Sequence, residues 1–194
     1  MKKRRLILGM VIGIVLLLTG WLFWRLHAGV RVNCVSEHKV NEQIIFYRQD
    51  NSEWGNDTLG NSSYTMKTSG CLVTCIASAI SVNDSTITPG KMNALFTKNS
   101  IYDEDGNMQW DQMQKIDGLH VERYDDVSND DIEHCLEEGR YPIVRVRRKG
   151  LGSYHYILIV GTDNGEYICM DPLEDRQMKL SEYGNFVYAV RCVW

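Results

Sequence analysis

The chain has 194 residues, of which 44% are hydrophobic, 24% are charged and only three are proline, so it is neither disordered nor collagen-like. Six basic residues and no acidic residue lie within the first 33 positions, whereas residues 34–194 carry 15 Lys and Arg against 25 Asp and Glu. An acidic body of this kind repels a phosphate backbone. Its only basic cluster is Arg145, Arg147, Arg148 and Lys149, and we therefore predict no nucleic-acid partner.

The segment from Leu6 to Trp24 contains no charged side chain and only one polar one, Thr19. As a helix it would span roughly 28 Å, which matches the hydrocarbon core of a bilayer. Four basic residues precede it directly, whereas only Arg25 and Arg31 follow. This positive-inside bias predicts a single-pass membrane protein with a cytoplasmic N-terminus and an extracytoplasmic body.

A cleaved signal peptide is the alternative, because a basic start followed by an apolar run also opens such peptides. The apolar region of a signal peptide is usually about 7–15 residues long, which is shorter than the run found here. The nearest candidate cleavage site follows Leu26-His27-Ala28, where a large leucine replaces the usual small residue. An uncleaved signal-anchor is thus favoured, and both alternatives export the rest of the chain.

We expect a cytoplasmic basic tail, a transmembrane signal-anchor, a polar linker and one domain, at residues 1–5, 6–24, 25–42 and 43–194. The exported part is long enough for one domain with a hydrophobic core and too short for two. It holds six cysteines, whose spacings match neither a C-x-x-C motif nor a zinc pattern. We expect no metal ion and no cofactor. The disulfide pattern stays open, but if one thiol serves chemistry, at least one more must remain unpaired.

Helices are predicted in the first part of the domain. Residues 71–80, CLVTCIASAI, are apolar nearly all round, which predicts a helix buried at the centre of the domain. Ser69 and Gly70 precede this helix, Ser69 as its expected N-cap and Gly70 as a residue that allows the chain to enter the helix through a tight turn. A second helix should begin near Pro89, and a third, over residues 128–138, has an N-cap serine and early acidic residues.

Strands are predicted in the second part of the domain, where apolar residues alternate with a period of two. Gly, Asn and Asp separate four such runs, at residues 143–147, 154–160, 166–170 and 186–193. Helices followed by an antiparallel sheet predict an α+β fold.

Cys71 is the strongest candidate nucleophile because it lies in the first turn of the predicted buried helix. Backbone N–H groups and the helix dipole favour a thiolate at this position. Cys75 lies one turn later on the same face, but deeper, in apolar surroundings. A cysteine in an apolar helix is most often a core residue, so the assignment depends on a partner for the thiol.

His155 and Asp171 are the candidate partners. His155 alone among five histidines begins a strongly apolar strand, and Asp171 closes the next strand. If residues 163–165 form a three-residue loop, the two side chains share one face and lie one diagonal step apart. A two-residue loop would reverse the parity and separate them. His155 would then simply fill a sheet edge, and Asp171 would end a strand.

A thiol, a histidine and a carboxylate in this order form the constellation of a nucleophile, a general base and an orienting residue. Acyl chemistry also requires a donor to the oxyanion. Gln49, upstream of the thiol, could place its side-chain amide beside the backbone N–H of Cys71. On its own, Gln49 would be interpreted as a surface residue.

Motifs occur along the chain in this order: Gln49-Asp50 with Trp54-Gly55-Asn56-Asp57, Thr68-Ser69-Gly70-Cys71-Leu72-Val73-Thr74, Thr88-Pro89, Trp110, Tyr141-Pro142-Ile143-Val144, Tyr154-His155-Tyr156 and Asp171-Pro172. Together they cover nearly all of residues 45–192 and resemble the peptidase C39-like family of papain-like cysteine peptidases. The resemblance implies a papain-like fold, with the cysteine on a central helix packed on an antiparallel sheet that carries the histidine and the aspartate. It also implies the site, with Cys71 as nucleophile, His155 as base, Asp171 as orienting residue and Gln49 as oxyanion residue.

The chain departs from many relatives, which read Gly-Cys-Gly-Pro-Thr where it has Gly70-Cys71-Leu72-Val73-Thr74. Leu72 and Val73 keep the helix but narrow the expected groove. The transporter-fused branch of the family cleaves leader peptides inside the cell. This chain carries no transporter, so we do not transfer that substrate to it.

We therefore predict a membrane-anchored extracytoplasmic cysteine hydrolase, in the first place a peptidase. One alternative is a non-catalytic module that keeps the fold and only binds peptides. The other is the same thiol chemistry on a cell-wall amide or in an acyl transfer. The sequence does not choose between peptide and cell-wall amide substrates, although the acidic body favours cationic or neutral ones at low salt.

Overall fold

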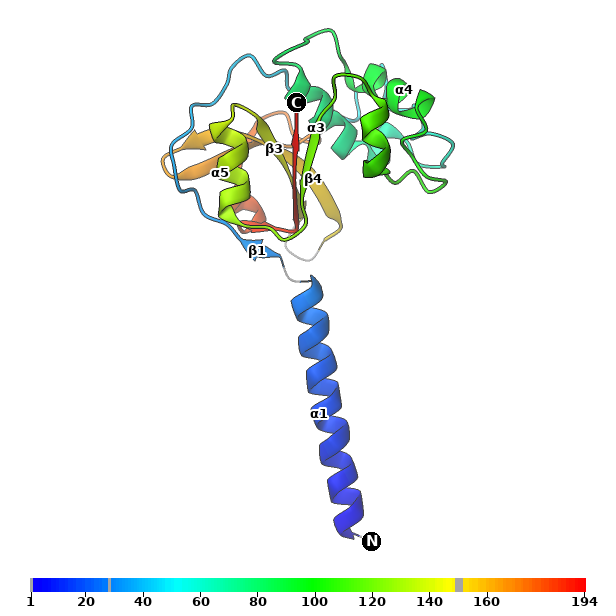
Figure 1. Cartoon of the computed structure of the whole chain (residues 1–194), viewed down its shortest axis with the longest axis vertical. Helices are drawn as coiled ribbons and strands as arrows, with labels where there is room; N and C mark the ends of the chain where they lie inside the picture. The colour runs from blue at the N-terminus through cyan, green and yellow to red at the C-terminus, as the bar shows by residue number, and fades with distance from the viewer. Residues whose placement is uncertain (1, 28, 149–151) are drawn as a thin grey trace.

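The computed structural model describes residues 2–27, 29–148 and 152–194, without the side chains of residues 2–8 and 25–27. Its first element is the helix α1 (Lys2–His27), which stands apart from the body of the protein in Figure 1. Within the described part of the chain, no helix is both long and apolar enough to cross a membrane. The predicted membrane-spanning helix over residues 6–24 is thus not supported, and the side chains of residues 6–8 lie outside the described part.

The body is built on one six-stranded antiparallel sheet, with strand order β2-β8-β3-β4-β5-β6. Two short strands, β1 and β7, pair with each other separately. The strands are β1 (Val30–Arg31), β2 (Val121–Tyr124), β3 (Tyr141–Arg147), β4 (Tyr154–Asp163), β5 (Glu166–Met170), β6 (Gln177–Lys179), β7 (Phe186–Val187) and β8 (Ala189–Val193). The predicted α+β class is confirmed, whereas the single strand expected over 186–193 is divided into β7 and β8.

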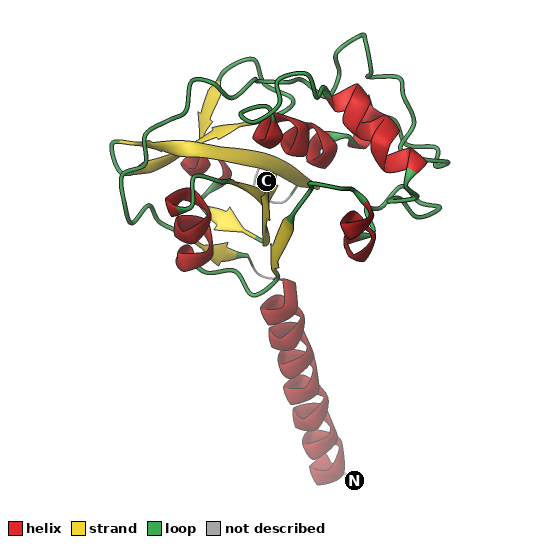
Figure 2. Cartoon of the chain, turned by 45° about the horizontal axis from the view of Figure 1, so that its top comes forward, coloured by secondary structure: helices red, strands yellow, loops and turns green. Residues whose placement is uncertain are grey.

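Helices cover both faces of this sheet (Figure 2). The predicted helices are all present, as α3 (Cys71–Ile80), α4 (Pro89–Lys98) and α5 (Asn129–Glu137). The sequence did not indicate α2 (Met66–Ser69) or the 3₁₀ helices η1 (Trp110–Lys115) and η2 (Leu180–Tyr183). α3 and α4 share one core with the sheet, and α5 packs on the opposite face in a second core.

α3 is the central helix of the first core. Seven consecutive residues from Val73 to Ala79 are buried, as expected for a helix that is apolar nearly all round. α2 ends one residue before α3 begins, and Gly70 joins them. A Cβ atom at Gly70 would lie 2.5 Å from the carbonyl oxygen of Met66, so only glycine allows the two helices to meet so closely.

The β4–β5 hairpin differs from the prediction at its turn but not at its far end. Asp163 pairs with Glu166, so the turn has two residues, Asn164 and Gly165, with φ values of 52° and 74°. These are left-handed conformations that suit Asn-Gly in a tight hairpin. The three-residue loop is therefore wrong. A bulge between Ile159 and Gly161 shifts the register back by one residue.

Residues 29–42, which we expected to belong to a linker, lie against the domain. β1 pairs with β7, and the next residue, Val32, is fully buried. Further along, the backbone N–H of His38 donates to the hydroxyl oxygen Oγ1 of Thr162 at 2.6 Å, and the backbone N–H of Thr162 donates to the carbonyl of His38 at 2.8 Å. We call residues 32–42 the N-terminal strap, because they tie the chain entering the body to α5 and β4.

One disulfide, Cys135–Cys192, joins α5 to β8, with a Cα–Cα distance of 6.1 Å. The other four cysteines, Cys34, Cys71, Cys75 and Cys169, are free. The sequence had left this pattern open. It had required at least one unpaired thiol besides a reactive one, and the structure has three.

Candidate active site

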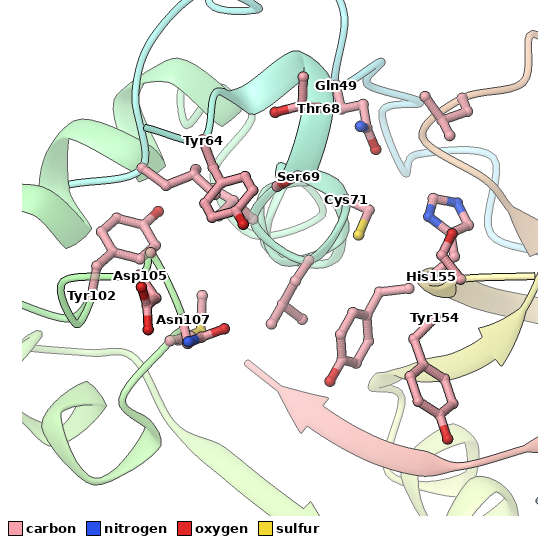
Figure 3. Close-up of a pocket in the computed structure, with 18 of the residues that line it drawn as sticks. Gln49, Tyr64, Thr68, Ser69, Cys71, Tyr102, Asp105, Asn107, Tyr154 and His155 are labelled. Atoms are coloured by element: carbon pink, nitrogen blue, oxygen red, sulfur yellow. The ribbon is translucent and has the colours of Figure 1, made fainter. Parts of the chain in front are cut away.

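A cleft of about 820 Å³ opens at the N-terminal end of α3 (Figure 3). α3 contributes Cys71, Leu72 and Val73 to its wall, and β4 contributes Tyr154, His155 and Tyr156. The other lining residues come from loops, α2 and η1 and are Gln49, Leu59, Tyr64, Thr68, Ser69, Tyr102, Asp105, Gly106, Asn107, Met108, Trp110, Arg148, Ser153 and Leu173. Leu72 and Val73 are thus wall residues of the cleft.

Cys71 is the first residue of α3 and is partly exposed to the cleft. Gly70 at the N-cap has no side chain to bond the first turn, so the N–H groups there remain free to meet a ligand. The imidazole of His155 lies close enough to the thiol of Cys71 for the two groups to interact, and this interaction raises the pKa of His155. Figure 3 shows the Cys71 side chain at the end of the helix and the His155 ring across from it.

His155 and Asp171 form a buried pair, each with 4% of its surface exposed. Nε2 of His155 lies 2.6 Å from Oδ1 of Asp171. Asp171 also accepts a hydrogen bond from the backbone N–H of Leu173 at 2.8 Å and one from the hydroxyl of Tyr183 at 2.5 Å. With Nε2 occupied by the carboxylate, Nδ1 is the ring nitrogen left for the thiol.

These contacts decide the protonation of the pair. Burial by itself lowers the pKa of His155, but the hydrogen bond to Asp171 and the interaction with Cys71 outweigh it and raise the pKa to about 9. Burial raises the pKa of Asp171, and the hydrogen bond from His155 reverses this, leaving the pKa below its usual value. At neutral pH the pair is therefore an imidazolium and a carboxylate, which suits stabilisation of a neighbouring thiolate.

Gln49 lies in the same cleft wall, with 2% of its surface exposed. Its backbone N–H donates to the carbonyl of Pro172, next to Asp171, at 3.0 Å. Its side-chain Nε2 donates to the carbonyl of Lys67 at 2.8 Å, whereas Oε1 is buried and has no hydrogen-bond partner. Since an amide nitrogen carries two protons, the second one remains available to the cleft.

Tyr183 is the site residue that sequence reasoning missed. Tyr183 is the last residue of η2, and its hydroxyl donates a hydrogen bond to the second carboxylate oxygen of Asp171, Oδ2. No spacing rule connects a tyrosine in a short 3₁₀ turn to a carboxylate twelve residues earlier. Burial and the hydrogen bond to Asp171 raise the pKa of Tyr183, so the phenol stays a proton donor to the carboxylate.

Cys75 and Cys169 lie outside the reactive arrangement. Cys75 has 1% of its surface exposed and donates to the carbonyl of Tyr156 at 3.5 Å. Burial raises the pKa of both thiols, which keeps them neutral. Among the described residues, no group of three or more His, Cys, Asp or Glu side chains is arranged to hold a metal ion.

A thiol at the start of a buried helix, facing a histidine–carboxylate pair on an antiparallel sheet, defines a cysteine-peptidase-like domain. Comparison of the sequence with known families gives the same class. Residues 41–191 match the Peptidase_C39 like family, so the chain belongs to this family. The family resemblance of the sequence is thereby confirmed.

Among solved structures, the fold is similar to that of a protein from Bacillus anthracis that is described as a C39-like peptidase. The two chains are 12% identical, with a TM-score of 0.53, and the match covers 82% of this chain and 98% of the other. At this identity the likeness concerns the fold alone. No curated protein matches the sequence.

Proposed function

We propose that this protein is a cysteine peptidase that uses Cys71 as its nucleophile, His155 as its general base and acid, and Asp171 as the residue that orients the imidazole. The observation that carries the proposal is the buried His155–Asp171 pair, whose Nε2 and Oδ1 atoms are 2.6 Å apart and which shares one cleft with the thiol of Cys71. Gln49 in the same cleft is the proposed oxyanion residue.

The proposed reaction passes through a thioester. The Cys71 thiolate attacks the carbonyl carbon of an amide and forms a carbon–sulfur bond, while the carbonyl oxygen becomes an oxyanion. The free N–H groups at the start of α3 and the second amide proton of Gln49 would stabilise that oxyanion. The His155 imidazolium gives its proton to the leaving nitrogen as the carbon–nitrogen bond breaks. Water, deprotonated by His155, then hydrolyses the thioester and releases the acid.

The substrate is proposed to be the amide bond of a peptide, either in a polypeptide or in the cell wall. A direct test incubates the purified full-length protein with a denatured proteome digest and with purified peptidoglycan, and identifies new termini by mass spectrometry. Wild type should cleave one of the two materials and Cys71→Ala should cleave neither, whereas Cys75→Ala should retain cleavage. A wild type that cleaves neither material would leave the fold with a binding role only and would contradict the proposal.

We further propose that the protein is held at a membrane with its catalytic domain on the extracytoplasmic side. The support is the uncharged run from Leu6 to Trp24 and the basic residues directly before it. Large apolar side chains stand exposed along α1, among them Leu17 at 76% and Trp24 at 67%. Protease treatment of intact cells and of spheroplasts tests the topology, because an extracytoplasmic domain is degraded without lysis. Recovery of the protein in the soluble fraction would overturn the proposal.

A further inference from the structure

Arg148, from the basic cluster of the sequence, lies at one end of the candidate active-site cleft, and Arg145 and Arg147 precede it in the chain. Arg145 and Arg147 are in β3, and Arg148 follows directly where the chain leaves the sheet. The backbone N–H of Arg148 donates to the carbonyl of Ser153 at 3.2 Å, which places Arg148 beside the start of β4 and His155. Arg148 lines the cleft together with Ser153 and Tyr154.

These three arginines differ from the other arginines of the body in having no acidic partner. Within residues 34–148 and 152–194, five arginines each form an ion pair with a carboxylate: Arg48, Arg123, Arg140, Arg176 and Arg191. Arg145, Arg147 and Arg148 form none with any described residue, although acidic residues outnumber basic ones in the body. A half-buried guanidinium without a counter-ion is an open site for an anion.

Two of the three arginines are held in place by aromatic rings. Arg147 donates to the hydroxyl of Tyr154 at 3.0 Å, and its guanidinium carbon lies 4.3 Å from the centre of the Tyr154 ring. The guanidinium carbon of Arg145 lies 4.5 Å from the same ring centre, and its Nε is buried without a partner. The Tyr154 ring thus holds the guanidinium groups of Arg145 and Arg147 in place, which fixes two positive charges beside the cleft. Arg148 makes no side-chain hydrogen bond with any described residue and remains available to a ligand.

The cleft is therefore polarised. Asp105 lines its other end, and Figure 3 shows Asp105 and Tyr154 on opposite sides of Cys71. We infer that the end of the cleft formed by Arg148 and Tyr154 is a subsite for a carboxylate of the peptide substrate. This inference rests on the proposed function. It differs from the expectation based on net charge alone, because the local positive potential at this end opposes the field of the acidic body.

The subsite can be tested without knowing the natural substrate, because a peptide that occupies the cleft shields Cys71 from a small alkylating reagent. The rate of iodoacetamide labelling at Cys71 of the full-length protein is measured with increasing amounts of three matched hexapeptide pools. The pools differ only in a fixed Glu, Gln or Lys residue. Each pool is used with a free and with an amidated C-terminus, which separates a side-chain carboxylate from a terminal one.

We expect the Glu pool to protect Cys71 at about tenfold lower concentration than the Gln pool, as for a hydrogen-bonded ion pair. Arg148→Gln should remove this difference. Lys98→Gln, which changes the charge equally at an exposed position of α4, should keep it. Protection by the free-C-terminus peptides regardless of side chain would assign the terminal carboxylate as the ligand group.

Equal protection by the Glu and Gln pools with both C-termini, or no protection by any pool, overturns the inference while leaving the proposed chemistry intact. Failure of the proposed function gives a different result. In that case iodoacetamide labels Cys71 of the wild type no faster than Cys71 of His155→Ala, whether or not the peptides protect it. A third outcome would show that the arginines bind anionic lipid headgroups at a membrane surface. In that case Arg148→Gln weakens sedimentation with anionic phosphatidylglycerol vesicles and leaves peptide protection unchanged, which also overturns the inference.

Discussion

Nε2 of His155 lies 2.6 Å from Oδ1 of Asp171 because two irregularities of the β4–β5 hairpin cancel. The two-residue turn at Asn164 and Gly165 alone would place the two side chains on opposite faces of the sheet. The bulge between Ile159 and Gly161 adds one residue to β4 and restores the alternation beyond it, where Leu158 pairs with Met170. The register at the site thus depends on the turn and the bulge together.

The thiol of Cys71 should react faster with iodoacetamide at pH 7 than the other free thiols, because it faces an imidazolium and the others do not. In His155→Ala, labelling of Cys71 should slow by at least about tenfold at pH 7 and approach the behaviour of an ordinary thiol, which ionises near pH 8.5. Peptide mass spectrometry reads each cysteine separately, and buried Cys75 serves as the internal control. Equal rates at Cys71 in both proteins would refute the thiol–imidazole pair.

Replacing Gln49 by Ala should lower kcat by about 10²-fold with little change in KM, as expected for loss of one oxyanion donor. The measurement uses any substrate found in the cleavage screen. Gln177→Ala, at an exposed position of β6, is the matched control and should leave kcat unchanged. If Gln49→Ala raises KM alone, the residue binds substrate in the ground state and is not an oxyanion donor.

Tyr183 should act as a positioning residue through Asp171. Removing its hydroxyl in Tyr183→Phe leaves one oxygen of a buried carboxylate without its partner, which loosens the orientation of the imidazole. We expect a loss of about threefold to tenfold in kcat/KM and a higher apparent pKa of His155 in the pH–rate profile, because a carboxylate that has lost the donor Tyr183 is a stronger acceptor for the imidazolium proton. A purely structural role predicts a lower melting temperature with an unchanged pH profile.

Much of this arrangement follows from local sequence, and the part that does not depends on long-range packing. The apolar run at 71–80 and the N-cap at Ser128 predict their helices, because each signal lies within one element. The Asn-Gly turn was misjudged, since hairpin loop length alone does not reveal a compensating bulge. The packing of residues 32–42 onto the domain was missed because its partners lie about one hundred residues away.

The stability of the protein should fall between about pH 6.5 and 9. A histidine whose pKa is raised to about 9 in the folded state stabilises it fully below its unfolded pKa of 6.5, and this contribution is lost as the pH rises through 9. The shift corresponds to about 3 kcal/mol for this buried ring. Denaturant unfolding of wild type and of His155→Gln at pH 6 and pH 9 measures the contribution of His155 to the free energy of unfolding. The free-energy difference between the two proteins should shrink at pH 9, and an equal difference at both pH values would contradict the assignment.

The N-terminal strap should depend on one buried carboxylate of α5, Glu133. With 6% of its surface exposed, Glu133 accepts a hydrogen bond from Tyr167 at 2.5 Å, pairs with His38 at 2.9 Å and accepts the backbone N–H of Val35 at 3.3 Å. Burial raises the pKa of Glu133, but the hydrogen bonds from Tyr167 and His38 outweigh this and lower it. The stabilisation is thus present above the ordinary pKa of a glutamate and is lost as the pH falls through the lowered value.

Glu133→Gln should therefore destabilise the protein by about 1–3 kcal/mol at pH 7, because the charge-assisted bonds are lost while the side-chain shape is kept. Hydrogen exchange should rise selectively at backbone amides of residues 32–42. Glu137→Gln, an exposed change on the same helix, is the control and should alter neither quantity. The loss in free energy of unfolding caused by Glu133→Gln should also be smaller at pH 4, because the wild-type carboxylate begins to be protonated there and its hydrogen bonds stabilise the protein less. An unfolding penalty that is spread evenly over the domain, without faster exchange in residues 32–42, would show that Glu133 stabilises α5 and not the strap.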